Sequence, residues 1–93
     1  DLSAEAGLAL LEATRGDEGP ARAAARLEAL EAANPESAVV AFNRGWLAVY
    51  RRDGALARAA WERTIALDPG GRLARVSRAL IASLGSGPGG RNP

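Results

Sequence analysis

Two helix-ending phrases, 34 residues apart, constrain the fold more than any other feature of this chain. Ala-Ala-Asn-Pro closes at Pro35, and Ala-Leu-Asp-Pro closes at Pro69. The residue before a proline is biased away from helical backbone, so each phrase predicts the end of a helix. A fixed period of this length is typical of chains built from repeated supersecondary units that bury their apolar faces against one another. The sequence therefore predicts a stack of repeats.

Turn residues divide the chain into five predicted helices that form one domain over residues 1–84. Apolar side chains recur at helical spacing in each segment, and no segment alternates with the period of a strand. Much of the apolar content is alanine, which has the best helix propensity and lets helices pack closely. The predicted helices span about 3–15, 20–33, 37–52, 55–67 and 72–84, and the glycine- and proline-rich residues 85–93 are expected to form a flexible tail.

The side chains that most often carry chemistry are missing from this chain. It contains no cysteine and no histidine, and all 12 basic residues are arginines. Disulfides, thiolate metal sites, histidine general bases and lysine chemistry are therefore excluded. Acidic neighbours such as Glu28 and Glu31 have no apolar pocket signal beside them and are interpreted as a solvated helix face. We expect no enzyme activity, no metal and no cofactor.

Charge is distributed unevenly along the chain. Residues 1–36 carry eight acidic side chains and three arginines, whereas residues 37–93 carry three and nine. Such asymmetry steers or orients partners. The last predicted helix has a basic row, for which phosphate contact is one interpretation. We favour a solvated cap face, because no aromatic side chain interleaves for base stacking, and we expect no nucleic-acid partner. The row consists of Arg72, Arg75 and Arg78.

No part of the sequence predicts a membrane segment. No apolar run reaches the roughly 20 residues needed to span a bilayer. The densest stretch, 38–50, is interrupted by Asn43 and Arg44. We expect a soluble protein and favour the cytoplasm.

The third predicted helix carries two rows of side chains at helical spacing. One row is apolar and aromatic and consists of Val39, Phe42, Trp46, Val49 and Tyr50. A row of small residues lies beside it and consists of Ala41, Gly45 and Ala48. Two interpretations of the aromatic row stay open. It packs as core against the first hairpin, or it is exposed and binds a partner, since Trp and Tyr are favoured anchors at interfaces.

Residues 38–71 resemble a unit of the tetratricopeptide-repeat (TPR) family. On its first helix the family prefers Trp, Leu-Gly and Tyr, and this chain has Ala41, Arg44-Gly45 and Ala48 at those positions. On its second helix the family prefers Ala and a large aromatic residue, followed by a closing Pro, and this chain has Ala57, Trp61 and Pro69. Residues 4–37 resemble a degenerate earlier repeat, and residues 72–84 resemble the start of a third repeat or a cap helix. The resemblance implies an all-α fold of antiparallel hairpins, stacked as a short right-handed superhelix of about two and a half repeats.

The resemblance also implies a function. In the family, the first helix of each repeat lines a concave groove that holds a peptide or helix of a partner protein. Matching by position places the aromatic row on this groove, with Asn43 beside it. The expected partner-binding residues are therefore Val39, Phe42, Asn43, Trp46, Val49 and Tyr50. Repeat arrays generally need three units for stability, and this chain has about two and a half. A second copy of the chain is therefore an alternative partner that would complete the array. The alternative function is that of a structural homo-oligomer.

Overall fold

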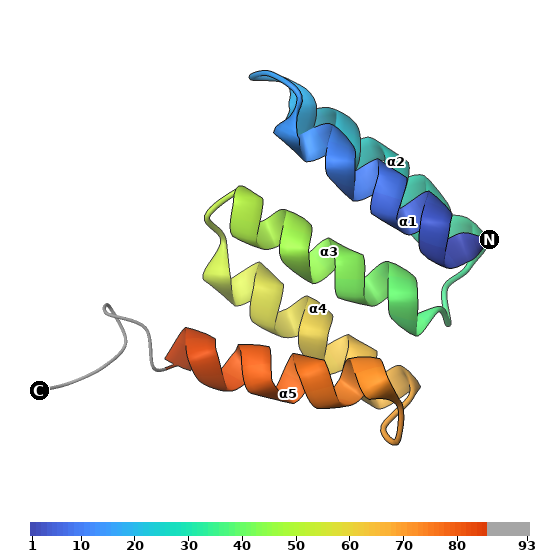
Figure 1. The fold of residues 1–93 in the computed structure, drawn as a ribbon, viewed down its shortest axis with the longest axis vertical. Coiled ribbons are helices and arrows are strands. Elements are labelled where there is room, and N and C mark those ends of the chain that lie inside the picture. Colours follow the sequence, from blue (N-terminus) through green and yellow to red (C-terminus); the bar gives the residue numbers. More distant parts are fainter. Residues whose placement is uncertain (86–93) are drawn as a thin grey trace, which may run out of the picture.

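A computed structural model describes residues 1–85, in which five α-helices are joined by short turns and no strand occurs (Figure 1). The all-α fold and the five predicted helices are confirmed. Gly85, predicted to begin the tail, instead ends the last helix, and the remainder of that prediction lies outside the described residues. The elements are α1 (Leu2–Leu11), extended by the 3-10 helix η1 (Glu12–Thr14), α2 (Gly19–Ala33), α3 (Ala38–Tyr50), α4 (Gly54–Leu67) and α5 (Arg72–Gly85).

Side-chain caps set the starts of α3 and α4. The Ser37 hydroxyl accepts a hydrogen bond from the Val40 amide at 3.2 Å, and the Asp53 carboxylate accepts one from the Leu56 amide at 3.0 Å. Each cap satisfies one of the amides that a helix start leaves unpaired. Between α3 and α4, the chain reverses at Arg52, whose φ of 59° lies in the left-handed region. A connection this short makes α3 and α4 an antiparallel hairpin.

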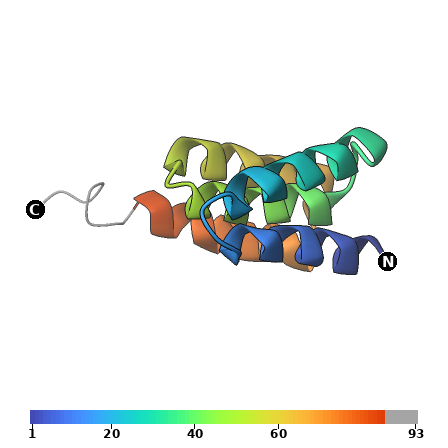
Figure 2. The ribbon, with the colours of Figure 1, turned by 90° about the horizontal axis from the view of Figure 1, so that it is seen from above.

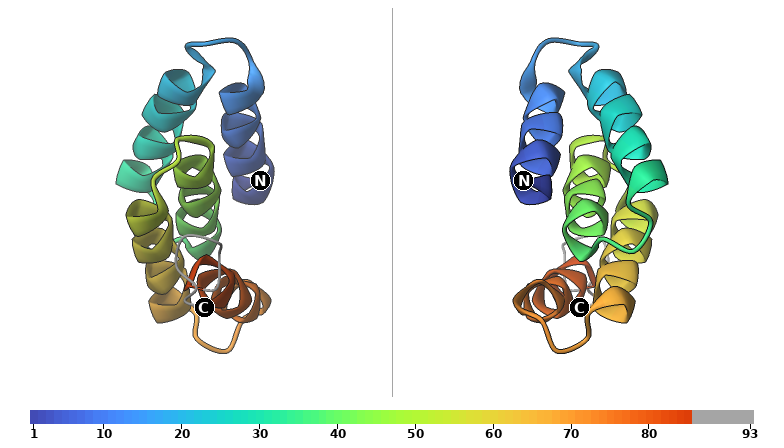
Figure 3. Two further views of the ribbon diagram at one scale, coloured as in Figure 1. Left: turned by 90° about the vertical axis from the view of Figure 1, so that its left-hand side faces the viewer. Right: turned by 90° about the vertical axis from the view of Figure 1, so that its right-hand side faces the viewer.

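The helices lie in two layers. Figure 3 shows α1, α3 and α5 on one side of the molecule and α2 and α4 on the other. In the view from above, α3 lies between the level of α1 and that of α2 and α4 (Figure 2). The layer of α1, α3 and α5 therefore bends inward at α3. We call this side of the molecule the α1–α3–α5 face. None of the helices within residues 1–85 is long and apolar enough to cross a membrane.

The first core lies between α1, α2 and α3 and is built mainly from alanine. Small side chains let these helices approach closely. Leu27 is the largest fully buried side chain that α1 and α2 contribute to it. The buried members of this first core are Ala6, Ala9, Ala13, Ala23, Leu27, Val40 and Leu47.

The second core lies between α3, α4 and α5 and surrounds Trp61, which is buried. The buried alanines Ala48 and Ala57 flank this ring, and larger side chains close over it. Those partly buried side chains are Phe42, Trp46, Leu80, Ile81 and Leu84. Because α3 contributes to both cores, it is the helix that joins the two hairpins.

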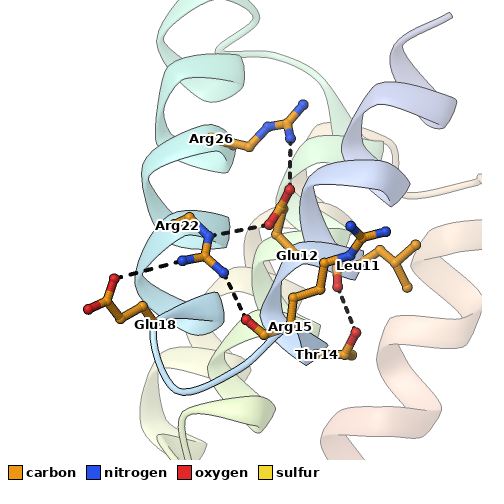
Figure 4. Close-up of polar contacts among 7 residues, drawn as sticks. All are labelled: Leu11, Glu12, Thr14, Arg15, Glu18, Arg22 and Arg26. Carbon is orange, nitrogen blue, oxygen red and sulfur yellow. Dashed lines mark hydrogen bonds and ion pairs between the residues drawn. The ribbon is translucent and has the colours of Figure 1, made fainter.

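An ionic cluster ties the end of α1 to α2 in the first hairpin (Figure 4). The Glu12 carboxylate accepts hydrogen bonds from Arg22 Nε at 3.4 Å and from Arg26 Nη1 at 3.3 Å. Arg22 also donates to the Arg15 carbonyl at 2.8 Å and lies 3.8 Å from Glu18. The loop that joins these helices is thus held by one arginine that reaches both of its ends.

Candidate partner-binding surface

The orientation of α3 is set by its close approach to α4. A Cβ atom at Gly45 would overlap the indole ring of Trp61. Ala57, on the facing helix, is fully buried. The Trp61 indole N–H donates to the Phe42 carbonyl at 3.2 Å, which satisfies the one polar group that this buried ring carries. Gly45 and Ala57 thus both lie beside Trp61, where α3 and α4 pack together.

Trp46 packs against the edge of this contact. Its ring centroid lies 5.3 Å from that of Trp61, and the two ring planes meet at 76°. Edge-to-face pairs of this geometry contribute about 0.5–1.5 kcal/mol beyond the area that they bury. Trp46 is half-buried, so one part of its ring belongs to the second core and another part faces solvent.

The structure divides the predicted aromatic row into two parts. Val39 is half-buried against the first core, and Phe42 and Trp46 are half-buried against the second. Val49 is 39% exposed and Tyr50 is 51% exposed, in the last turn of α3. The core interpretation needs correction, because it placed the row against the first hairpin, whereas only Val39 packs there and Phe42 and Trp46 pack in the second core. Three members contribute to core packing, and the last two are exposed apolar surface.

Asn43, the polar member of the predicted site, points back into its own helix. It is 9% exposed, and its side-chain amide donates to the Val39 carbonyl one turn earlier at 2.8 Å. Asparagine within a helix commonly bonds to neighbouring backbone in this way. A buried amide that already has a partner offers little to a ligand. The exposed part of the predicted site is therefore apolar.

Positive charge borders the exposed end of the row. Arg51 and Arg52 follow Tyr50 directly, and both are exposed. On the neighbouring helix α5, Val76 is exposed, and one turn further on Leu80 packs with the rings of the second core. A ligand on this side of the molecule would meet apolar side chains, with positive charge near the end of α3.

The basic row of α5 is exposed as the sequence predicted. Arg72, Arg75 and Arg78 all face solvent, and Arg78 donates to the Pro69 carbonyl at 3.1 Å. That bond connects the first part of the α4–α5 turn to the helix that follows it. One of the three arginines thus has a structural contact, which agrees with the interpretation as a cap face.

The opposite side of α3 carries a groove that the sequence analysis missed. It lies between α2 and α4, with α3 as its floor, and its volume is about 250 Å³. A signal was present, because an apolar and basic row recurs every three or four residues along α4. We call it the α2–α4 groove, lined by Ala24, Glu28, Glu31, Ala41, Arg44, Leu47, Ala48, Arg51, Leu56, Ala59, Ala60 and Arg63.

The predicted environment of Glu31, one of the residues that line this groove, needs correction. The sequence placed it on a solvated helix face, but in the structure its carboxylate forms an ion pair with Arg44. The side chains of Glu31 and Arg44 are only 33% and 29% exposed. The pair joins α2 to α3, a contact between residues 13 apart that helical spacing cannot reveal.

Comparison with known proteins adds no relative. No family model, curated protein or solved structure matches this chain. Among residues 1–85, no three side chains of the metal-binding type gather in one place. The residues and their geometry are thus the basis on which we infer a function.

Proposed function

We propose that this chain is a TPR-like interaction module that binds a peptide or helix of a partner protein and catalyses no reaction. Its antiparallel hairpins would form a short right-handed superhelix with the α1–α3–α5 face as the concave side. The observation that carries the proposal is the exposed end of the aromatic row, where Tyr50 is 51% exposed beside the half-buried Trp46. Tyrosine and tryptophan are the side chains most enriched among binding anchors.

The surroundings of Tyr50 indicate what kind of segment would bind. Val49 and the partly buried rings offer apolar surface, and the exposed Arg52 adds positive charge at one end. An amphipathic helix fits such a face when its apolar side chains recur every three or four residues. Acidic side chains near one end of that helix would lie close to Arg52 and speed its association.

Selection from a displayed library of random peptides tests this proposal without a known partner. The immobilised chain should enrich peptides with apolar side chains at helical spacing and an acidic end. Fluorescence anisotropy with a selected, labelled peptide then gives its affinity. Tyr50→Ala should weaken binding about fivefold or more, because truncation of an anchor residue typically costs over about 1 kcal/mol.

The matched control is Leu8→Ala. Leu8 is 59% exposed, but it lies beside Arg26, Ala29 and Leu30 on the α1–α2 side of the molecule. It should leave peptide binding unchanged, and both variants should keep the helical circular dichroism of the parent chain. Equal peptide affinity in Tyr50→Ala and the parent chain would refute the proposal. The alternative of a homo-oligomer built through the same row predicts that Tyr50→Ala reduces self-association instead.

A further inference from the structure

The α2–α4 groove lies on the side of α3 that faces away from the proposed ligand surface. Along the floor, Ala41, Arg44, Ala48 and Arg51 follow one another at intervals of three and four residues. At 3.6 residues per turn, these positions lie on the opposite side of the helix from Trp46. The groove is therefore a second surface, and an occupant there would leave the α1–α3–α5 face free.

Alanines make up three of the seven side chains on the walls of the groove, and the walls are low at these positions. Ala24 stands on the α2 wall, and Ala59 and Ala60 stand on the α4 wall. Small residues at a helix surface let another backbone approach closely. Leu56 is the large apolar side chain of the walls, and it is 48% exposed at one end of the α4 wall. From Leu56 to Arg63 the wall extends about 10 Å at 1.5 Å per residue, which is two helical turns.

The two walls carry opposite charge. Glu28 is exposed on the α2 wall, one turn before Glu31. Arg63 is exposed on the α4 wall and donates to the neutral Pro35 carbonyl at 3.0 Å. Within residues 1–85, neither Arg63 nor Arg51 forms an ion pair with a carboxylate. The α4 side thus has positive charge to offer, and the α2 side has negative charge.

We propose that the α2–α4 groove is the interface of a symmetric dimer, in which α4 of each copy lies in the groove of the other. A two-fold axis parallel to the groove brings the α2 wall of one copy to the α4 wall of its partner. Arg63 then meets Glu28 of the second copy, and Leu56 inserts among the groove's alanines. An axis across the groove would instead place the two acidic walls together, which like charges oppose.

A second copy is the favoured occupant because both halves of the complementary surface are present in this chain. An isologous interface needs one patch that complements itself. The groove satisfies that condition, with an acidic wall, a basic wall, an exposed leucine and alanine-lined space in a single patch. The inference goes beyond the peptide-binding proposal and does not depend on it.

Sedimentation velocity across a dilution series tests the dimer. The apparent molecular mass should rise with concentration from that of one copy of the full chain toward that of two. Leu56→Asp should raise the dimer dissociation constant at least about tenfold, because it places a carboxylate in the apolar contact and the symmetry of the dimer applies the loss twice. Added salt should weaken the parent dimer, since the exposed charge pairs are screened.

A charge exchange tests the proposed arrangement of the two copies. Arg63→Glu should weaken the dimer, because it places a carboxylate beside Glu28 of the other copy. Adding Glu28→Arg to this variant should restore association, since each pair is again of opposite sign. All of these positions are exposed, so the variants should retain the helical circular dichroism of the parent chain.

The control and the contrary outcomes separate this inference from the peptide-binding proposal. Tyr50→Ala should leave the dimer intact while it reduces peptide binding, and Leu56→Asp should do the reverse. A chain that stays monomeric at every concentration would overturn the inference. So would a dimer that is unaffected by Leu56→Asp and Arg63→Glu, or one that Tyr50→Ala disrupts. Either result would leave the peptide-binding test to be judged separately.

Discussion

The two hairpins of this molecule are stabilised in different ways. The first packs α1 and α2 through buried alanines around Leu27, and the Glu12 cluster with Arg22 ties its loop. The second places Trp61 in the space that Gly45 leaves on the facing helix. Two hairpins of the same type are thus stabilised differently, the first by many small contacts and the second by one large side chain.

This difference determines how each hairpin responds to mutation. A tryptophan buries about 150–250 Å², which corresponds to about 4–6 kcal/mol at 25 cal/mol per Å². An alanine methyl buries far less, so stability in the first hairpin is spread over many residues. In the second hairpin, mutation of one residue should cause most of the possible loss of stability. In the first hairpin, each mutation should cause only a part of it.

The largest effect is expected from Trp61→Ala. Removing a buried tryptophan costs about 3–5 kcal/mol, and here it also removes the edge-to-face partner of Trp46. Urea unfolding followed by far-ultraviolet circular dichroism measures the loss. A small domain has little stability in reserve, so Trp61→Phe provides a milder variant if the alanine variant is unfolded in buffer. A loss below about 1 kcal/mol in Trp61→Ala would contradict the concentrated role given to this ring.

Leu27→Ala makes the corresponding change in the first core. Truncation of a buried leucine costs about 2–5 kcal/mol, and because Leu27 is smaller than Trp61 we expect its loss to be the lesser of the two. The same urea titration compares the two variants directly. An equal or larger loss at Leu27 would show that the first hairpin also depends on one dominant side chain, and the contrast between the hairpins would fail.

Gly45→Ala tests the narrow contact between α3 and α4. The added methyl group would overlap the Trp61 indole, and overpacking of this kind costs about 1–3 kcal/mol. Gly7→Ala is the matched control, because open space surrounds that position in α1. There the change should stabilise the chain by about 0.5–1 kcal/mol through helix propensity. Thermal unfolding should therefore move in opposite directions for the two variants.

Glu12→Gln should have the smallest effect. The arginines that it contacts are at least half exposed, and pairs of this kind contribute about 0–1 kcal/mol. Stability should fall by less than 1 kcal/mol in low salt, and the difference from the parent chain should shrink as salt screens the cluster. A loss that persists in high salt would show that the cluster holds the hairpin by more than charge.

Local signals in the sequence predicted much of this fold. The phrases ending at Pro35 and Pro69 placed two helix ends, because proline restricts the backbone just before it. The row of small residues that contains Gly45 lies where α3 comes close to α4, and small side chains permit such an approach. The candidate site was predicted less well. The spacing of the aromatic row identified its helix, but not which members are exposed.

The sequence by itself determined the properties that depend on near neighbours along the chain. These are the helical conformation, the helix ends and the sets of side chains that share one face of a helix. Only the tertiary structure decided that Val49 and Tyr50 are exposed while Phe42 is half-buried, and that a groove opens between α2 and α4. The physical reason is that burial depends on which other helices cover a face. Those helices come from distant parts of the chain, and helical periodicity carries no information about them.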